Sequence, residues 1–326
     1  MALREITTYS HEHNPPDRSD KWGAKMSDQD VDDIAAPNFC DESYESDRKK
    51  AIEDMIGRID LPDMTPSDMK KLKAVLWKYE SVFHTMIGAN GRAKVPPLEI
   101  ELLDPTKKFP AVGTRKYSPH HMAEMRRQVA AMVAKGVLVE DTDGTPYVSP
   151  ALCIKKPDNT IRLCADARVI NSMTRGNSHP MPFCSTVTRE VSAHYFMQTD
   201  LLRFYWQCPV TEKTSRLLGF LLPWKTYLWR VAPMGVKQAA AHCCRVLDTL
   251  LRDMPNVQSY VDDCIVYHMT PRVFIQSVER FLHVMKKANL ALSPKKTHFK
   301  HHCVFVGQLV NRRGTQIDPQ RIEALR

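Results

Sequence analysis

Long apolar runs, a secretory signal and paired cysteine motifs are all missing from this chain of 326 residues. No apolar stretch reaches the roughly 18 residues that a membrane span needs. The N-terminal segment "MALREITTYSHEHNPPDRSD" lacks the apolar core of a signal peptide. The nine cysteines are scattered, apart from adjacent Cys243 and Cys244, and no Cys-x-x-Cys occurs. These absences argue against a disulfide framework or zinc ribbon and predict a soluble, reduced, intracellular protein without a membrane partner.

Charge is divided unevenly along the chain, although the net charge is +9. Residues 1–66 carry 8 Lys/Arg and 16 Asp/Glu, whereas the remainder carries 38 Lys/Arg and 21 Asp/Glu. A basic body behind an acidic leader suggests a polyanionic partner for the body. Charge alone does not identify that partner, because many soluble proteins are basic.

The polar segment 1–60 has little periodicity and is predicted to be an acidic, mostly disordered leader. Residues 61–94 are predicted to form a helical N-terminal extension, because apolar residues recur at helical spacing within 65–86. A separate folded body would then occupy 95–326.

Beyond residue 117 the pattern alternates between helices and strands. Ser118 can cap a helix that Gly136 would end, and further helices are predicted at about 237–251 and from Thr270 onward. Short strands joined by tight turns fill much of the remainder, ending in a final hairpin within 301–317. We therefore predict a mixed α/β (α+β) fold in which antiparallel pairs outnumber parallel crossovers.

The stretch "QSYVDDCIVY" places Asp262 and Asp263 side by side between two strand-like runs. They could form a solvated hairpin tip, because Asp tolerates turns. Alternatively, a divalent metal could cancel their repulsion, which would require another hard oxygen ligand nearby. Asp200 is the best candidate, since it ends the strand-like run "YFMQTD", although a lone Asp there could equally be a strand-end cap. Three such carboxylates could bind two Mg²⁺ ions for in-line phosphoryl transfer.

The order of the segments resembles the reverse transcriptase domain of LTR-retrotransposon Pol polyproteins, most closely the gypsy type. The motifs that carry the resemblance span about residue 95 to the C-terminus: "SPALCIKKPDNTIRLCADARVIN", "YFMQTDLLRFYWQCPV", "VAPMGVKQAAAH", "YVDDCIVY", "LALSPKKTHF" and "VFVGQLV". The resemblance implies a right-hand polymerase whose fingers and palm occupy 95–326, with a largely antiparallel palm sheet. The final "DPQRIEALR" resembles the entry to a thumb, so we expect the thumb to be absent and processivity to be poor.

The resemblance also implies catalytic roles. Asp200, Asp262 and Asp263 would hold two Mg²⁺ ions, for which Mn²⁺ could substitute, and Lys296 would protonate the pyrophosphate leaving group. Alternatively, Lys296 is one charge in a basic run. The partners would be an RNA or DNA template with a DNA primer, together with dNTPs; the oligomeric state is left open.

For the incoming dNTP, the resemblance implies a site whose side chains come from several motifs. Lys155, Lys156 and Arg162 would grip the triphosphate, and Tyr205 would exclude a ribose 2′-hydroxyl. Leu201, Met234 and Gly235 complete the expected dNTP-binding set. The alternatives are an ordinary basic hairpin tip and a core tyrosine.

Some positions depart from the family pattern. Phe204 stands where a small residue usually precedes the tyrosine, and its ring is expected to crowd the nucleotide pocket. Lys237 and Gln238 replace the usual Thr-Asn. Two readings follow: an RNA-directed DNA polymerase, or an inactive relic that binds primer–template. A metal-dependent nuclease is disfavoured by the tyrosine and the fingers cations.

Overall fold

The computed structural model describes residues 42–88, 91–155, 161–176, 179 and 191–317. Its helices are α2 (Glu42–Gly57), α3 (Pro66–Lys78), the 3₁₀ helix η1 (Glu80–Val82), α4 (Pro119–Ala134), α5 (Arg168–Met173), α7 (Phe204–Gln207), α8 (Glu212–Arg216), α9 (Lys237–Leu251) and α10 (Pro271–Ala288). Its strands are β1 (Leu138–Glu140), β2 (Val148–Lys155), β3 (Ile161–Ala165), β4 (Tyr195–Asp200), β5 (Gly219–Leu221), β6 (Thr226–Trp229), β7 (Val257–Tyr260), β8 (Asp263–His268), β9 (His298–Lys300), β10 (Cys303–Phe305), β11 (Gln308–Asn311) and β12 (Gly314–Ile317).

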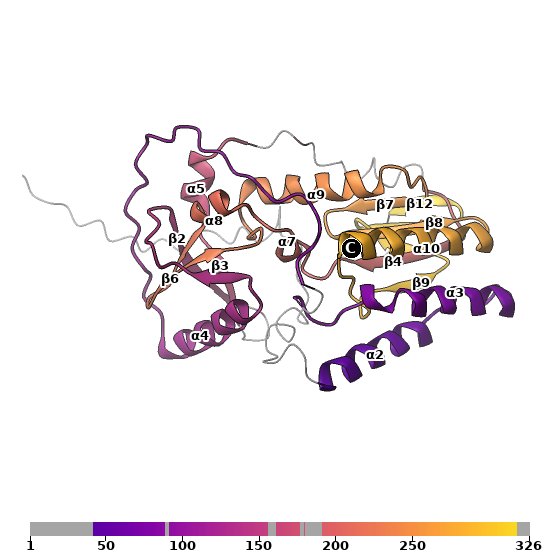
Figure 1. The fold of residues 1–326 in the computed structure, drawn as a ribbon. Coiled ribbons are helices and arrows are strands. Elements are labelled where there is room, and N and C mark those ends of the chain that lie inside the picture. Colours follow the sequence, from indigo (N-terminus) through magenta and orange to yellow (C-terminus); the bar gives the residue numbers. More distant parts are fainter. Residues whose placement is uncertain (1–41, 89–90, 156–160, 177–178, 180–190, 318–326) are drawn as a thin grey trace, which may run out of the picture.

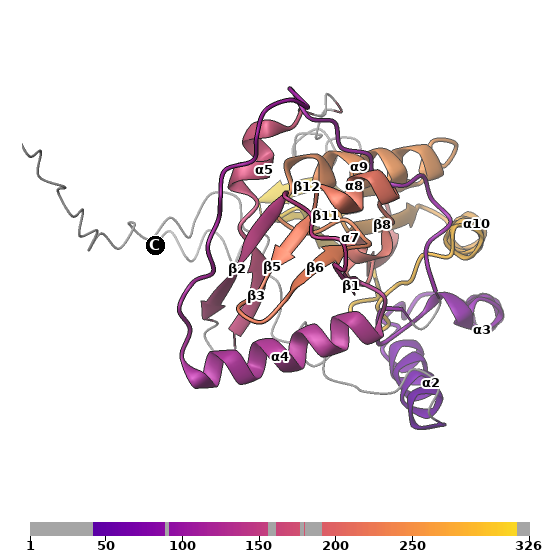
Figure 2. The same ribbon diagram turned by 60° about the vertical axis from the view of Figure 1, so that its left-hand side comes forward.

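The fingers sheet has the strand order β1-β6-β5-β2-β3. Its pairs are antiparallel except β2 with β5, which run parallel. Helix α4 lies across this sheet and contacts β1 and β3 (Figure 2). Ser118 accepts a hydrogen bond from the His121 amide at the start of α4, and Gly136 adopts φ +64° just after its end. The predicted N-cap and the glycine stop are therefore confirmed.

The palm sheet has the order β7-β8-β4-β9, and all of its pairs are antiparallel. Helix α10 packs on β8 and β4, while α9 contacts β7 and extends from the palm half toward the fingers half (Figure 1). Both helices therefore cover one face of the sheet. The expected mixed α/β fold with mainly antiparallel pairing is confirmed, as is the predicted helix at 237–251.

Helix α10 shows why its sequence folds onto the palm. Its apolar residues recur three and four positions apart, so they form one face directed at the sheet. Those on the buried face include Phe274, Val278, Phe281, Leu282 and Met285, each fully buried. Burial of each such side chain contributes about 1.5–3 kcal/mol. Asn289 ends the helix in the left-handed region at φ 53°.

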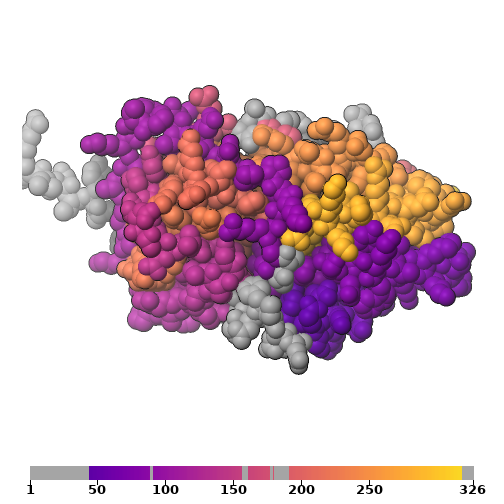
Figure 3. All heavy atoms as spheres, in the orientation of Figure 1, coloured from indigo at the N-terminus to yellow at the C-terminus, as the bar shows by residue number. Residues whose placement is uncertain are grey.

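The N-terminal helices pack against the palm half, as the indigo and purple atoms beside the gold ones show (Figure 3). Helix α3 contacts α10, and α2 buries Ile52 and Met55. Arg48 is also buried and donates to the backbone oxygen of Glu80 at 2.9 Å. The prediction that the leader is mostly disordered up to residue 60 is wrong for residues 42–57. The periodicity of α2 was obscured because polar residues share its buried face.

The C-terminal strands form a three-stranded sheet, β10-β11-β12, instead of the single hairpin predicted. Strand β11 pairs with both neighbours, so two successive hairpins replace one. A small second core joins this sheet to the palm; it consists of Val191, Ala193, Phe196, Ile265, Cys303, Phe305 and Val310. Among the described helices, none combines the length and apolarity needed to cross a membrane.

Candidate active site

Two aspartates face each other at one end of the palm sheet. Asp200 is the last residue of β4 and Asp263 the first of β8, and they are register partners across the antiparallel pair. Partners in such a pair project from the same face of the sheet. The amide of Leu201 donates to the backbone oxygen of Asp262 at 2.9 Å, which ties the connecting turn to the end of β4. The fold thus brings the three predicted aspartates to one edge.

The turn between β7 and β8 consists of Val261 and Asp262 alone. Val261 has φ +58°, a conformation that is strained for a β-branched residue. A positive φ at the first central position matches the right-handed twist of the strands in a two-residue hairpin. The turn therefore presents Asp262 in a fixed position at the cost of backbone strain.

Burial and mutual repulsion act on these carboxylates. Burial, followed by the charge of Asp262, raises the pKa of Asp200 to about 7. The same two causes raise the pKa of Asp263 to about 6. Raised carboxylate pKa values mean that negative charge is poorly compensated here. A cation bound among these oxygens would supply the missing compensation.

Lys296 provides part of that compensation. Its Nζ lies 3.3 Å from Oδ2 of Asp200, and the side chain is half-buried. The adjacent Thr297 is fixed by hydrogen bonds, since its hydroxyl lies 2.7 Å from that of Thr199 and donates to the backbone oxygen of Ser293 at 2.7 Å. The amide of Ser293 donates in turn to the backbone oxygen of Asp200. These bonds hold the lysine against the edge that carries the aspartates.

The residues after Asp200 correct two expectations about the nucleotide pocket. The ring of Phe204 is fully buried in the main core, so it cannot contact a nucleotide in this conformation, and the expected crowding is wrong. The side chain of Leu201 is also fully buried, which excludes a side-chain contact with dNTP. Tyr205 remains partly accessible, and burial raises the pKa of its hydroxyl well above the ordinary value, so the hydroxyl stays neutral.

The loop before α9 carries Met234, which is exposed, and Gly235 at φ +94°. A side chain at position 235 would be strained by that φ. Asn171 holds the loop in place: its Nδ2 donates to the Gly235 oxygen at 2.8 Å, and its Oδ1 accepts from the Lys237 amide at 3.0 Å. Sequence reasoning missed this positioning role, because the bonds cross 60 and more residues of chain.

The basic residues predicted to bind the triphosphate do not all lie on one face of the fingers hairpin. Lys155 pairs with Ile161 and Arg162 with Ile154, so the two basic side chains leave opposite faces of the β2–β3 hairpin. Lys155 is exposed, whereas Nε of Arg162 is buried and has no hydrogen-bond partner among the described residues. Lys156 and the hairpin tip lie outside the described residues.

Comparison with known families decides what this arrangement is. Residues 154–314 match the family model "Reverse transcriptase (RNA-dependent DNA polymerase)". These residues form a reverse transcriptase domain. The matched segment contains Asp200, Asp262, Asp263 and Lys296, so the edge that carries these residues lies inside the domain.

The reverse transcriptase domain is similar to parts of several polyproteins. The Pro-Pol polyprotein of Simian foamy virus type 3 (strain LK3) is 25% identical over 260 residues, a match that covers 77% of this chain and 22% of the relative. The Pol polyprotein from transposon gypsy of Drosophila melanogaster is 27% identical over 191 residues, covering 56% of this chain and 18% of the relative. The chain spans about a fifth of the length of these curated relatives.

Solved structures show the same fold. The foamy viral protease-reverse transcriptase in complex with an RNA/DNA hybrid superposes with a TM-score of 0.74 at 20% identity, covering 85% of this chain and 37% of that one. The structure of the same protein type with double-stranded DNA gives a TM-score of 0.74 at 19% identity and covers 85% of this chain and 57% of that one. The fingers-and-palm fold is therefore established for this reverse transcriptase domain.

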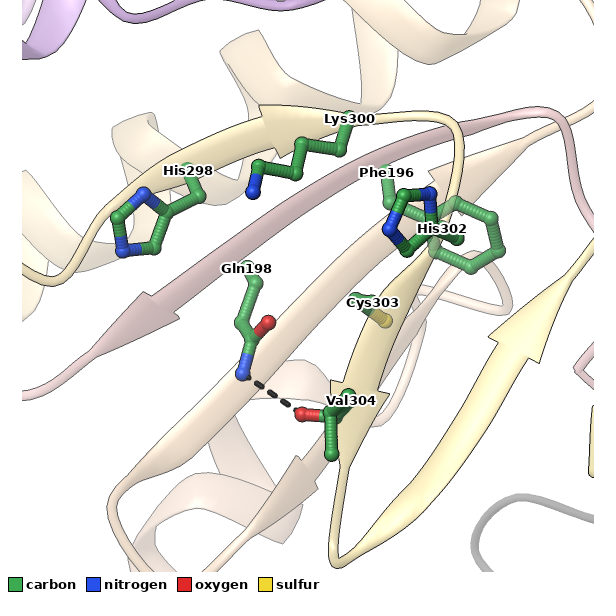
Figure 4. A pocket seen from close by; sticks show the side chains of 7 residues that line it. All are labelled: Phe196, Gln198, His298, Lys300, His302, Cys303 and Val304. Atoms are coloured by element: carbon green, nitrogen blue, oxygen red, sulfur yellow. Dashed lines mark hydrogen bonds between the residues drawn. The ribbon is translucent and has the colours of Figure 1, made fainter. Parts of the chain in front are cut away.

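A cavity opens over strands β4, β9 and β10 of the reverse transcriptase domain (Figure 4). It has a volume of about 330 Å³ and is lined by Phe196, Gln198, His298, Lys300, His302, Cys303 and Val304. Gln198 and His298 are register partners, and Nε2 of Gln198 donates to the Val304 oxygen at 3.0 Å. Since side chains alternate along β4, Gln198 shares a face of the sheet with Asp200. The cavity thus lies on the same face of the palm sheet as Asp200.

Proposed function

We propose that this chain is the RNA-directed DNA polymerase part of a gypsy-type retrotransposon, and that it adds dNTPs to the 3′-hydroxyl of a DNA primer. The primer 3′-oxygen would attack the α-phosphorus of the dNTP, and the bond to pyrophosphate would break. The observation that carries the proposal is the register pairing of Asp200 with Asp263, with Asp262 in the adjoining turn.

The donor chemistry of the three carboxylates suits a pair of Mg²⁺ ions, for which Mn²⁺ could substitute. Their donor atoms are carboxylate oxygens, which hard divalent cations prefer, and the raised pKa values of Asp200 and Asp263 mark uncompensated negative charge. When bound, such ions activate the attacking hydroxyl and neutralise the leaving group. Lys296 would hold a proton close to the position of the departing pyrophosphate.

The dNTP would lie between the fingers hairpin and the catalytic edge. The buried Nε of Arg162, which has no partner among the described residues, supports a role in binding an anionic triphosphate. We assign further contacts to Lys155, Lys156, Met234 and Gly235, and a role in sugar discrimination to Tyr205.

The primer–template would lie on the face of the palm sheet that carries Asp200. Lys300 lines the cavity on this face, and a cationic side chain of this kind binds the phosphate backbone. The solved relatives in complex with RNA/DNA hybrid and double-stranded DNA support nucleic acid as a partner. An intracellular setting is supported by the described cysteines, which are all free thiols.

Primer extension tests the proposal. Protein is incubated with a DNA primer on an RNA template, with Mg²⁺ or Mn²⁺, and compared with Asp262→Asn and with Asp253→Asn, an exposed aspartate elsewhere in the chain. We expect metal-dependent extension that only Asp262→Asn abolishes. Folded protein that binds primer–template but never extends it would instead be the inactive relic, and the proposal would fail.

A further inference from the structure

A second polar cluster lies at the opposite end of β4 from the catalytic aspartates. It consists of Asp63 from the α2–α3 connection, His194 just before β4, and His301 between β9 and β10. Strand β4 spans six residues at about 3.3 Å each, which puts the cluster about 20 Å from Asp200. The cluster is therefore separate from the catalytic edge.

One carboxylate holds both imidazoles in this cluster. Nε2 of His194 lies 2.6 Å from Oδ2 of Asp63, and Nε2 of His301 lies 2.8 Å from Oδ1. The two imidazole rings are stacked, with centroids 4.2 Å apart. The ligand atoms of the three residues all lie within 4.8 Å of one another. Both histidines thus direct the same ring nitrogen at the same carboxylate.

The hydrogen bonds of His301 indicate how its ring would bind a cation. Nδ1 lies 2.7 Å from the backbone oxygen of His194, and a carbonyl can only accept, so Nδ1 carries a proton. In the neutral ring this leaves the lone pair on Nε2, which faces Asp63. A ligating histidine typically donates its other ring N–H to a backbone carbonyl or carboxylate, which fixes its orientation. His301 already has that second bond.

Hydrogen bonds also orient the carboxylate of Asp63 and favour its ionised form. The hydroxyl of Tyr195 donates to its Oδ2 at 3.0 Å. Desolvation opposes ionisation, but hydrogen bonds from His194 and Tyr195 outweigh it and hold the pKa of Asp63 below the ordinary value. The carboxylate is therefore ionised at neutral pH, as a metal ligand must be.

We propose that Asp63, His194 and His301 form a binding site for a divalent transition metal, with Zn²⁺ as the best match. Two imidazoles and one carboxylate suit Zn²⁺ far better than Mg²⁺, which prefers oxygen ligands. Tetrahedral Zn²⁺ bonds of about 2.0–2.2 Å would place the ligand atoms about 3.4 Å apart. A modest rotation of one stacked ring would bring the three ligand atoms to this separation. All three side chains are partly exposed, which leaves a fourth position for water.

The metal would join the N-terminal helices to the palm. The same connection is already docked there: Arg58 donates to the backbone oxygen of Pro294 at 2.9 Å, and the Asp60 amide donates to that of Phe299 at 3.0 Å. A metal that links Asp63 to His194 and His301 would therefore stabilise a contact between segments more than 130 residues apart in the chain. Its role is structural and does not depend on polymerase activity.

Zn²⁺ and Co²⁺ titrations of the full chain test the site. Excess Mg²⁺ is kept present to occupy oxygen-only sites, and Co²⁺ absorption and calorimetry report binding. We expect one ion per chain, and a loss of affinity of more than about 100-fold in His194→Ala and His301→Ala, because changes to outer-shell partners alone cost about 10- to 100-fold. His302→Ala is the matched control, since this exposed neighbour lies outside the cluster.

Two further measurements keep the proposal testable if the alanine variants fold poorly. In the unsubstituted protein, Zn²⁺ should shift the Nε2 resonances of two of the 13 histidines in nitrogen NMR spectra. Asp262→Asn should leave Zn²⁺ binding unchanged. Absence of tight binding, or equal affinity in His301→Ala and the control, would overturn the proposal and leave the cluster as a hydrogen-bonded contact.

Discussion

Asp200 and Asp263 are register partners across β4 and β8, so one buried and one half-buried carboxylate share one face at the end of the palm sheet. The hydrogen bond from Leu201 to the Asp262 backbone keeps the third aspartate at the same edge. Nζ of Lys296 lies 3.3 Å from Oδ2 of Asp200, yet burial together with the charge of Asp262 raises the pKa of Asp200 to about 7. This opposition to ionisation has consequences for stability as well as for catalysis.

Without added metal, stability should fall as pH rises through the pKa of Asp200. The pKa is raised from 3.8 to about 7, so between these values the native state retains a proton that the unfolded chain has lost. The free energy of unfolding therefore falls between about pH 4 and pH 7 and stops falling above about pH 7. Asp200→Asn removes this dependence, and we expect its Tm at pH 8 in EDTA to exceed that of the unsubstituted protein, by about 2–4 °C for each kcal/mol regained.

With Mg²⁺ at pH 8, the unsubstituted protein should have a higher Tm than Asp200→Asn. Mg²⁺ raises the Tm of the unsubstituted protein more at pH 8 than at pH 5, because the ion competes with protons for the carboxylates. Differential scanning calorimetry of both proteins with EDTA and with Mg²⁺ makes the comparison. An unsubstituted protein whose metal-free stability relative to Asp200→Asn increases from pH 5 to pH 8 would contradict the assignment.

Lys296→Ala should lower the rate of nucleotide addition by about 10²-fold or more, the range typical of a lost general acid. The KM for dNTP should change far less, because the ammonium lies beside Asp200 rather than on the fingers hairpin. Lys295→Ala is the matched control, since its side chain is exposed and adjacent in sequence. Single-turnover kinetics separate the two effects, and equal losses in both variants would argue against a specific role.

Val261→Gly should stabilise the protein by about 1 kcal/mol. A left-handed conformation costs about 1–3 kcal/mol at a non-glycine residue such as Val261, and glycine removes this cost. Glycine also has more conformational entropy in the unfolded state, which offsets about 0.5–1 kcal/mol of the stabilisation. Urea unfolding measures the difference. Ser259→Gly, on β7 at an ordinary strand position, is expected to destabilise. A destabilised Val261→Gly protein would show that side-chain packing outweighs the strain.

Lys300→Ala should weaken primer–template binding and reduce the salt dependence of log K by about 1, as expected for the loss of one phosphate contact. Lys71→Ala provides the comparison, because Lys71 is exposed on α3, which packs against α10 on the other side of the palm sheet. Fluorescence anisotropy at several salt concentrations reports both slopes. If log K depends on salt concentration equally in both variants, the cavity is not part of the surface that binds nucleic acid.

Local signals in the sequence predicted much of the fold and the edge of the palm sheet at which Asp200, Asp262 and Asp263 meet. Period-2 and period-3.6 patterns placed β4 and α10, and capping residues placed the start of α4 at Ser118. Helix α2 was missed because Tyr44 and Arg48 interrupt its apolar face, although both are buried: Tyr44 bonds His84 and Arg48 bonds the Glu80 backbone. Packing partners, which a linear pattern does not contain, decided that case.

Features that depend on contacts between distant segments could not be predicted from the sequence either. The opposite faces taken by Lys155 and Arg162 depend on strand register, and the burial of Phe204 depends on how α7 meets the core. The Asp63–His194–His301 cluster gave no signal either, because its members come from three separated segments and share no motif spacing.

The parallel pairing of β2 with β5 has a consequence for how this architecture can be exchanged between relatives. The fingers sheet draws on residues 138–165 and again on 219–229, with palm strand β4 between them in the chain. A chimaera made with one crossover anywhere in 166–218 would combine half a sheet from each parent. A single crossover therefore keeps the fingers sheet intact only if it lies outside 138–229, and palm strand β4 is then inherited together with the sheet.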